Sequence, residues 1–168
     1  MPDLLLDIEI AASPARVWSV LTDFAAYPAW NPYQTFEGRA EPFAIVQISS
    51  RDLTGRALQV FSAAIWKLEP GRKLELLVGK LLWLASRRIF HLEAVGDGTW
   101  LRHGLVFSGI VSAWKSPSAQ EMENLRPLYA AFGAALKRRA EEPVCASSTE
   151  MSRPPTRPGN RRTRRVSR

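Results

Sequence analysis

The chain has 168 residues, of which 46% are hydrophobic and 23% charged, enough for one globular domain with a proper core. Its formal net charge of +7 suggests a nucleic-acid partner, but residues 151–168 hold seven arginines and no acidic residue. The remaining 16 basic residues are balanced by 16 acidic ones, so the basicity belongs to this terminal segment and not to the domain.

Several classes of protein are disfavoured by what the sequence lacks. No apolar run approaches the roughly 18 residues of a membrane span, and the acidic residues in MPDLLLDIEI argue against a signal peptide. Cys145 is the single cysteine, which excludes an internal disulfide and a C-x-x-C metal motif. We therefore expect a cytoplasmic protein that uses neither a metal nor a cofactor.

The first elements are a strand and a short helix. Residues 4–10 alternate between apolar and polar side chains, which predicts a half-buried strand. In the following segment Ser13 is a good N-cap and Pro14 suits the first helical position. Pro28 and Pro32 prevent a long continuation of this helix.

The next segment, DFAAYPAWNPYQ at residues 23–34, is unusually aromatic and stiff for a connection. Tyr27 and Trp30 supply apolar surface, whereas Asn31 is expected to fix the corner through backbone hydrogen bonds. We predict that the segment closes one end of an apolar cavity and partly lines it.

The chain from residue 34 to residue 108 reads as consecutive strands without an intervening helical pattern, which indicates antiparallel hairpins. The candidate strands lie within residues 34–41, 42–52, 56–69, 73–83, 86–95 and 99–109. The glycine-rich Gly96-Asp97-Gly98 is a hairpin turn of the expected chemistry.

The last ordered element is predicted to be a long helix that ends near residue 142. Met122, Leu125, Tyr129, Phe132 and Leu136 recur at helical spacing on one face. Either Ser116 or Ser118 would cap its start. The sequence thus predicts an α+β domain over residues 1–142, followed by a disordered basic tail over residues 143–168.

Two segments of the sequence resemble a known family. IAASPARVWSVLTDFAAYPAWNP is similar to the opening signature of the START-like (SRPBCC) superfamily, in its polyketide cyclase/dehydrase and lipid-transport branch, and RIFHLEAVGDGTWLRHGLVFSG is similar to its closing hairpin. The resemblance covers roughly residues 3–142. It implies a helix-grip fold, in which a seven-stranded antiparallel sheet wraps around the long C-terminal helix with two short helices after the first strand. It also implies a hydrophobic tunnel between sheet and helix.

Candidate site residues follow from strand parity and from the helical stripe. Arg88 shares a face with Phe90 and Leu92, and it stands where the family pattern often has histidine. His103 shares a face with Phe107, so both polar groups are expected to point inward. The expected apolar walls are Trp30, Phe61, Ile65, Phe90, Leu92, Phe107, Met122, Leu125, Tyr129 and Phe132. The polar groups expected to orient a ligand are Tyr27, Asn31, Arg88 and His103.

Strand parity also leaves two questions open. A register slip by one residue would turn Arg87, Ile89 and His91 inward in place of Arg88. On the strand at 56–69 both faces are apolar, so Trp66 could line the cavity or cover a second surface.

Three functions remain as hypotheses. The leading one is a binding protein, monomeric or homodimeric, for a small lipid-, polyketide- or aromatic-like ligand. The second is a cyclase, aromatase or dehydratase in which His103 moves a proton and Arg88 steadies an enolate or carboxylate. The third is an interaction module whose basic tail contacts nucleic acid or an anionic membrane. No P-loop, G-x-S-x-G or H-E-x-x-H motif is present.

Overall fold

The computed structural model describes residues 3–80, 84–108 and 118–143. In chain order the elements are β1 (Leu4–Ile10), α1 (Pro14–Thr22), the 3-10 turn η1 (Phe24–Ala26), α2 (Tyr27–Trp30), β2 (Gln34–Glu37), β3 (Ile45–Arg51), β4 (Ala57–Glu69), β5 (Lys73–Lys80), β6 (Leu84–Val95), β7 (Gly98–Ser108) and α4 (Ala119–Glu141). The seven strands form one sheet in the order β1-β7-β6-β5-β4-β3-β2. Every neighbouring pair is antiparallel, as the sequence predicted.

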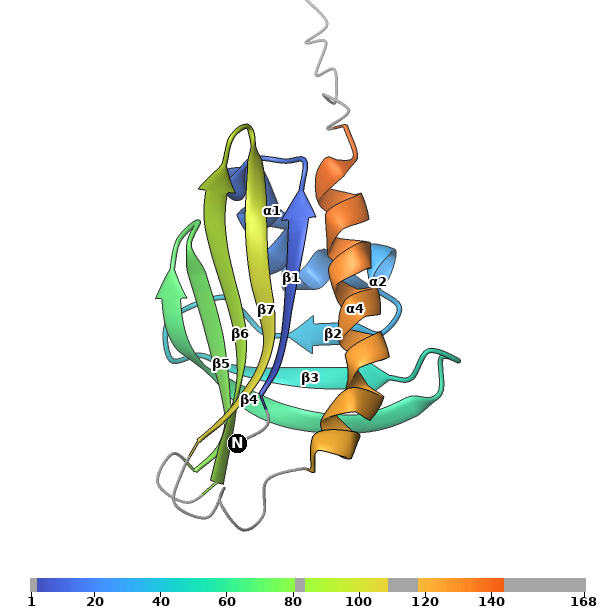
Figure 1. Cartoon of the computed structure of the whole chain (residues 1–168). Helices are drawn as coiled ribbons and strands as arrows, with labels where there is room; N and C mark the ends of the chain where they lie inside the picture. The colour runs from blue at the N-terminus through green and yellow to red at the C-terminus, as the bar shows by residue number, and fades with distance from the viewer. Residues whose placement is uncertain (1–2, 81–83, 109–117, 144–168) are drawn as a thin grey trace, which may run out of the picture.

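The sheet is strongly curled around α4. Figure 1 shows β1, β7 and β6 running upright beside the helix, whereas β2 and β3 run across it. Register shifts at Ser50/Arg51 and at Ile65/Lys67 accompany this bend, because a bulge increases local twist. The predicted helix-grip architecture, with two short helices after the first strand, is confirmed.

Local sequence explains where the first helix and the last hairpin form. Ser13 Oγ accepts a hydrogen bond from the Arg16 amide, and Pro14 occupies the first helical position, so α1 begins as predicted. Val95 pairs with Gly98 across the β6–β7 turn. Gly96 in this turn has a φ of 57°, a conformation that glycine adopts without steric cost.

The long helix α4 begins with a complete capping box. Ser118 Oγ accepts a hydrogen bond from the Glu121 amide, and the Glu121 carboxylate accepts one from the Ser118 amide. Of the two candidate caps, Ser116 and Ser118, the helix therefore uses Ser118. Pro127 lies inside the helix, as the sequence indicated.

Two groups of buried apolar side chains fill the space between α4 and the sheet. The larger one, which we call the packed end, brings the C-terminal half of α4 against α1, α2 and the sheet, and it includes Leu21, Tyr27, Phe132 and Leu136. The smaller one contains Leu4, Met122 and Tyr129, with Leu105, Phe107 and Leu125 partly buried against it. We call this region the cavity end, because it borders the cavity described below.

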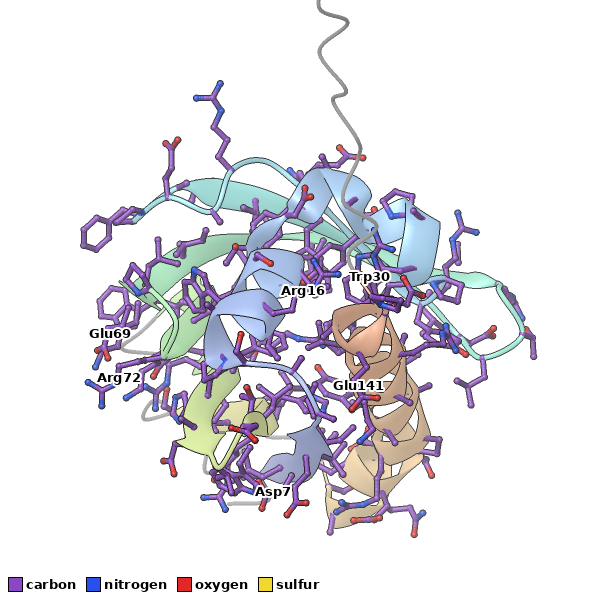
Figure 2. The ribbon with its side chains drawn as sticks, turned by 90° about the horizontal axis from the view of Figure 1, so that it is seen from above. Asp7, Arg16, Trp30, Glu69, Arg72 and Glu141 are labelled. Atoms are coloured by element: carbon purple, nitrogen blue, oxygen red, sulfur yellow. The ribbon has the colours of Figure 1, made fainter. Side chains whose placement is uncertain are left out.

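The aromatic segment of residues 23–34 belongs mostly to the packed end. The Tyr27 ring lies 4.5 Å from the Trp30 ring and 4.7 Å from the Phe36 ring. Seen from above, Trp30 lies between α2 and the C-terminal part of α4 (Figure 2), and its ring is 6.1 Å from that of Phe132. The segment therefore plugs the end of the core.

Asn31 holds the corner of this segment, as predicted. The side chain is completely buried. Its Oδ1 accepts hydrogen bonds from the backbone amides of Tyr33, at 3.0 Å, and Gln34, at 3.3 Å. These bonds turn the chain from α2 into β2.

The strand registers settle the two open questions of side-chain direction. Arg88 is buried on the inner face of β6, whereas Arg87 and His91 lie on the outer face and contact Glu75. The alternative register that would turn Arg87, Ile89 and His91 inward is therefore wrong. Trp66 is 43% exposed on the outer face of β4.

The predicted disordered tail, with Cys145 in it, lies outside the described residues apart from Pro143. Within the described residues, no helix is long and apolar enough to cross a membrane.

Candidate ligand cavity

A cavity of about 560 Å³ lies between the N-terminal half of α4 and the inner face of the sheet. This volume falls within the roughly 300–1,000 Å³ that is usual for small-molecule sites. The lining residues come from β2 to β7 and from α4: Gln34, Ile48, Ser50, Leu58, Gln59, Phe61, Val78, Ser86, Arg88, Leu105, Phe107, Met122, Leu125, Leu128 and Tyr129.

The cavity extends from the surface into the interior. Leu58 and Gln59, near the start of β4, are exposed, whereas Arg88 and Met122 are buried. Most of the lining side chains are apolar, so the cavity suits a hydrophobic molecule.

Arg88 is the charged group of this cavity. Its side chain is 4% exposed. The centre of its guanidinium group lies over the rings of Phe132, Tyr129 and Phe90, at 4.5, 4.6 and 5.1 Å from their centroids. Burial lowers the pKa of Arg88, while the neighbouring hydroxyls of Tyr129 and Tyr27 act in the opposite direction. The three rings stabilise the cation through their π faces.

The donors of Arg88 are incompletely satisfied. Nε and Nη2 are buried and have no hydrogen-bond partner among the described residues. No carboxylate in the described part of the chain forms an ion pair with Arg88. A second cavity residue, Gln34, is 5% exposed and has an unpartnered Oε1.

The structure divides the predicted site residues into two sets. Those that line the cavity are Phe61, Arg88, Phe107, Met122, Leu125 and Tyr129. Those that lie outside its lining are Tyr27, Trp30, Asn31, Ile65, Phe90, Leu92, His103 and Phe132. All members of the second set are buried. Phe90, Phe132 and His103 lie behind the wall, in contact with the lining residues Arg88 or Tyr129.

His103 is a core residue at the boundary between the packed end and the cavity end. It is 1% exposed, and its ring stacks on Phe90 and Tyr129 at centroid distances of 6.2 and 6.5 Å. Burial, reinforced by the charge of Arg88, lowers the pKa of His103 to about 3. The imidazole is therefore neutral near pH 7 and does not reach the cavity, which argues against the proton-transfer role considered above.

Gly133 explains how α4 approaches the sheet at His103. A Cβ atom at residue 133 would lie 2.7 Å from His103 Nε2. Only glycine therefore allows the helix to rest on the imidazole at this distance.

Several lining residues were missed by the sequence reasoning. Ser86 and Leu105 share strand parity with Arg88 and Phe107, so the same pattern could have identified them. Ile48, Ser50 and Val78 could not be identified in this way, because the cavity wall depends on which strands curl beneath α4. Leu58 and Gln59, which are neighbours in sequence, both contribute at the mouth.

The described residues contain no group of three or more His, Cys, Asp or Glu side chains placed to hold a metal ion.

Comparisons with known proteins agree with this architecture. A family model described as polyketide cyclase/dehydrase and lipid transport matches residues 1–141. A START superfamily protein from Mycobacterium smegmatis has a TM-score of 0.64 at 19% identity, over 83% of this chain and 97% of that protein. No curated protein shows significant similarity to the sequence.

Two further solved structures share the fold. The Aha1 protein from Colwellia psychrerythraea, described as a dimer in solution, has a TM-score of 0.60 at 22% identity, over 84% of this chain and 98% of that protein. DynU16, a protein of the dynemicin biosynthetic locus, also has a TM-score of 0.60, at 17% identity, over 84% of this chain and 48% of that protein. At these identities the likeness extends to the fold alone.

Proposed function

Because the chain belongs to the polyketide cyclase/dehydrase and lipid transport family, as its sequence motifs predicted, we propose that it binds a small hydrophobic ligand beneath the N-terminal half of α4. The observation that carries this proposal is the cavity of about 560 Å³ with a mostly apolar wall and a few polar groups. Burial of apolar ligand surface against such a wall provides the main driving force.

Binding is favoured over catalysis by the chemistry of the wall. Among the described lining residues, Arg88 and Tyr129 are the side chains that titrate. Burial raises the pKa of Tyr129, so its hydroxyl stays protonated near neutral pH. Burial lowers the pKa of Arg88, but a guanidinium group is not deprotonated in proteins. Neither serves as a general base at that pH, and His103 lies outside the lining.

The experiment is a titration with the neutral fluorescent probe N-phenyl-1-naphthylamine, whose emission rises in an apolar site. Ser86 lines the cavity, so Ser86→Phe should fill part of it and weaken probe binding by at least about tenfold. The matched control is Ser62→Phe, which places the same ring at an exposed position of β4 and should leave binding unchanged.

The result that contradicts the proposal is equal probe binding by Ser86→Phe and the wild type, with both variants folded by circular dichroism. If Ser86→Phe does weaken probe binding, native mass spectrometry of the protein purified from an extract of its own organism would identify the natural ligand by its mass.

A further inference from the structure

We propose that the ligand carries one carboxylate, and that Arg88 binds this group at the buried side of the cavity. This inference rests on the proposed function and adds the chemical class of the ligand, an apolar carboxylic acid. It starts from a cation that is almost completely buried, at 4% exposure, in the wall of an apolar cavity. A buried charge is costly unless an opposite charge and hydrogen bonds compensate it.

The unpartnered atoms of Arg88 are those that hold carboxylates elsewhere in this molecule. Arg102 Nε and Nη2 donate to the two carboxylate oxygens of Asp7 at 2.8 and 3.0 Å. Arg126 uses the same two atoms toward Glu123, at 2.8 and 2.7 Å. In Arg88, the same Nε–Nη2 edge is buried without a partner among the described residues. This edge matches the two oxygens of a carboxylate.

The described part of the chain places no acidic side chain at this position. None of the described lining residues is acidic. Of the residues beyond the described ones, Glu150 is the single acidic residue in the sequence. The rings of Phe90, Tyr129 and Phe132 stabilise the cation through their faces, but a ring face cannot accept the in-plane hydrogen bonds of Nε and Nη2. A ligand oxyanion can.

The charge balance selects a carboxylate over a phosphate monoester. Arg88 is the charged side chain among the described lining residues, so one monoanion neutralises the site. A phosphate monoester carries about −1.5 to −2 at neutral pH, which would leave excess negative charge among apolar side chains. The rest of the ligand would lie along Phe61, Phe107 and Leu125.

The test compares three probes of one chain length by displacement of N-phenyl-1-naphthylamine at about pH 8, where the acid is ionised. The probes are dodecanoate, dodecanol and dodecyl phosphate. The wild type should bind dodecanoate about 10- to 100-fold more tightly than dodecanol, because a hydrogen bond to a charged group contributes on this scale. Tighter binding of dodecyl phosphate than of dodecanoate would overturn the assignment to a carboxylate.

The variant that isolates the charge is Arg88→Met, which keeps a long side chain and removes the guanidinium group. It should lose the preference for dodecanoate and bind dodecanol within about threefold of the wild type. Arg88→Lys keeps the charge without the paired donors. Its preference for dodecanoate over dodecanol should therefore lie between those of the wild type and Arg88→Met. If the wild type binds neither N-phenyl-1-naphthylamine nor any of the C12 probes, the proposed function fails. If both bind equally and Arg88→Met changes nothing, the inference alone fails.

The thermal stability of the ligand-free protein distinguishes a ligand-binding role of Arg88 from a purely structural one. Arg88→Met removes a buried charge without an acidic partner, so the melting temperature of the ligand-free protein should stay the same or rise. A fall of several degrees, together with an unchanged preference for dodecanoate, would show that Arg88 only supports the aromatic cluster.

Discussion

The two halves of α4 face different surroundings, although they belong to one helix. In its C-terminal half, Phe132 and Leu136 are buried in the larger core cluster, and Arg16 donates hydrogen bonds to the backbone carbonyls of Arg139 and Ala140. In its N-terminal half, Met122, Leu125 and Tyr129 line the cavity. The helix is thus anchored at one end and forms the ceiling of the cavity at the other.

One fold thus combines a stable core with a candidate binding site. The packed end has the close packing that supports a single native structure. The cavity end gives up some of this packing, and it holds a buried cation in a wall whose described residues include no acid. Substitutions at the two ends should therefore have opposite consequences, with large losses of stability at the packed end and losses of binding at the cavity end.

The largest contrast is expected from the same substitution made in each half of α4. Leu136 is completely buried, so Leu136→Ala should reduce the free energy of unfolding by about 2–5 kcal/mol. Leu125 is only partly buried and lines the cavity, so Leu125→Ala should cost less than about 1 kcal/mol. Urea denaturation of both variants measures the difference. Equal losses would contradict the division of the helix into two ends.

The next effect concerns His103, which lies at the boundary between the ends. Its pKa is about 3 in the folded protein, whereas the ordinary histidine pKa of 6.5 applies to the unfolded chain. Between these values the unfolded chain binds a proton that the folded protein does not. Stability should therefore decrease as the pH falls from about 6.5 toward 3, by about 1.4 kcal/mol per pH unit from this group.

The measurement is the urea midpoint at several pH values between about 6.5 and 5, above the range in which most carboxylates titrate. His103→Leu removes the titrating group and should show a shallower slope than the wild type. Parallel slopes would show that the histidine is protonated in the folded protein, and hence accessible.

A smaller loss is expected where α4 rests on that imidazole. Gly133→Ala would place a Cβ atom 2.7 Å from His103 Nε2, and overpacking of this kind costs about 1–3 kcal/mol. The His103→Ala background removes the clash. There the same Gly133→Ala change should stabilise the protein by up to about 1 kcal/mol, because alanine has the higher helix propensity. A double-mutant cycle by thermal denaturation tests this reversal of sign.

The smallest effect is expected at the start of α4. Ser118→Ala removes one half of the capping box and should cost about 1 kcal/mol. Because this cap lies at the cavity end, the variant should also increase amide hydrogen exchange in the first turns of α4, with little change near Leu136. Uniform exchange along the helix would contradict the prediction.

Much of the fold could be predicted because it depends on local patterns. Alternation identified β1, the Ser13-Pro14 pair identified the start of α1, and the helical stripe identified the buried face of α4. The hairpin turn at Gly96-Asp97 follows from the need for a positive φ. Each of these features is decided within a few residues of the chain, where steric constraints and hydrogen bonding act directly.

The candidate site could be predicted only in part. Parity on β6 and β7 showed that Arg88 and His103 point inward, but parity does not say how far along the sheet each residue lies. Arg88 lines the cavity, whereas His103 is buried in the core, although side chains alternate in the same way on both strands.

The order of the elements and the family could be inferred from the sequence alone. The boundary between core and cavity could not be inferred in this way, because it depends on the curl of the sheet and on where α4 rests against it. Gly133 allows close approach at His103, whereas an open cavity remains beside Arg88 under the N-terminal half of α4. Such a boundary is set by packing among residues that are distant in sequence, and no local pattern encodes it.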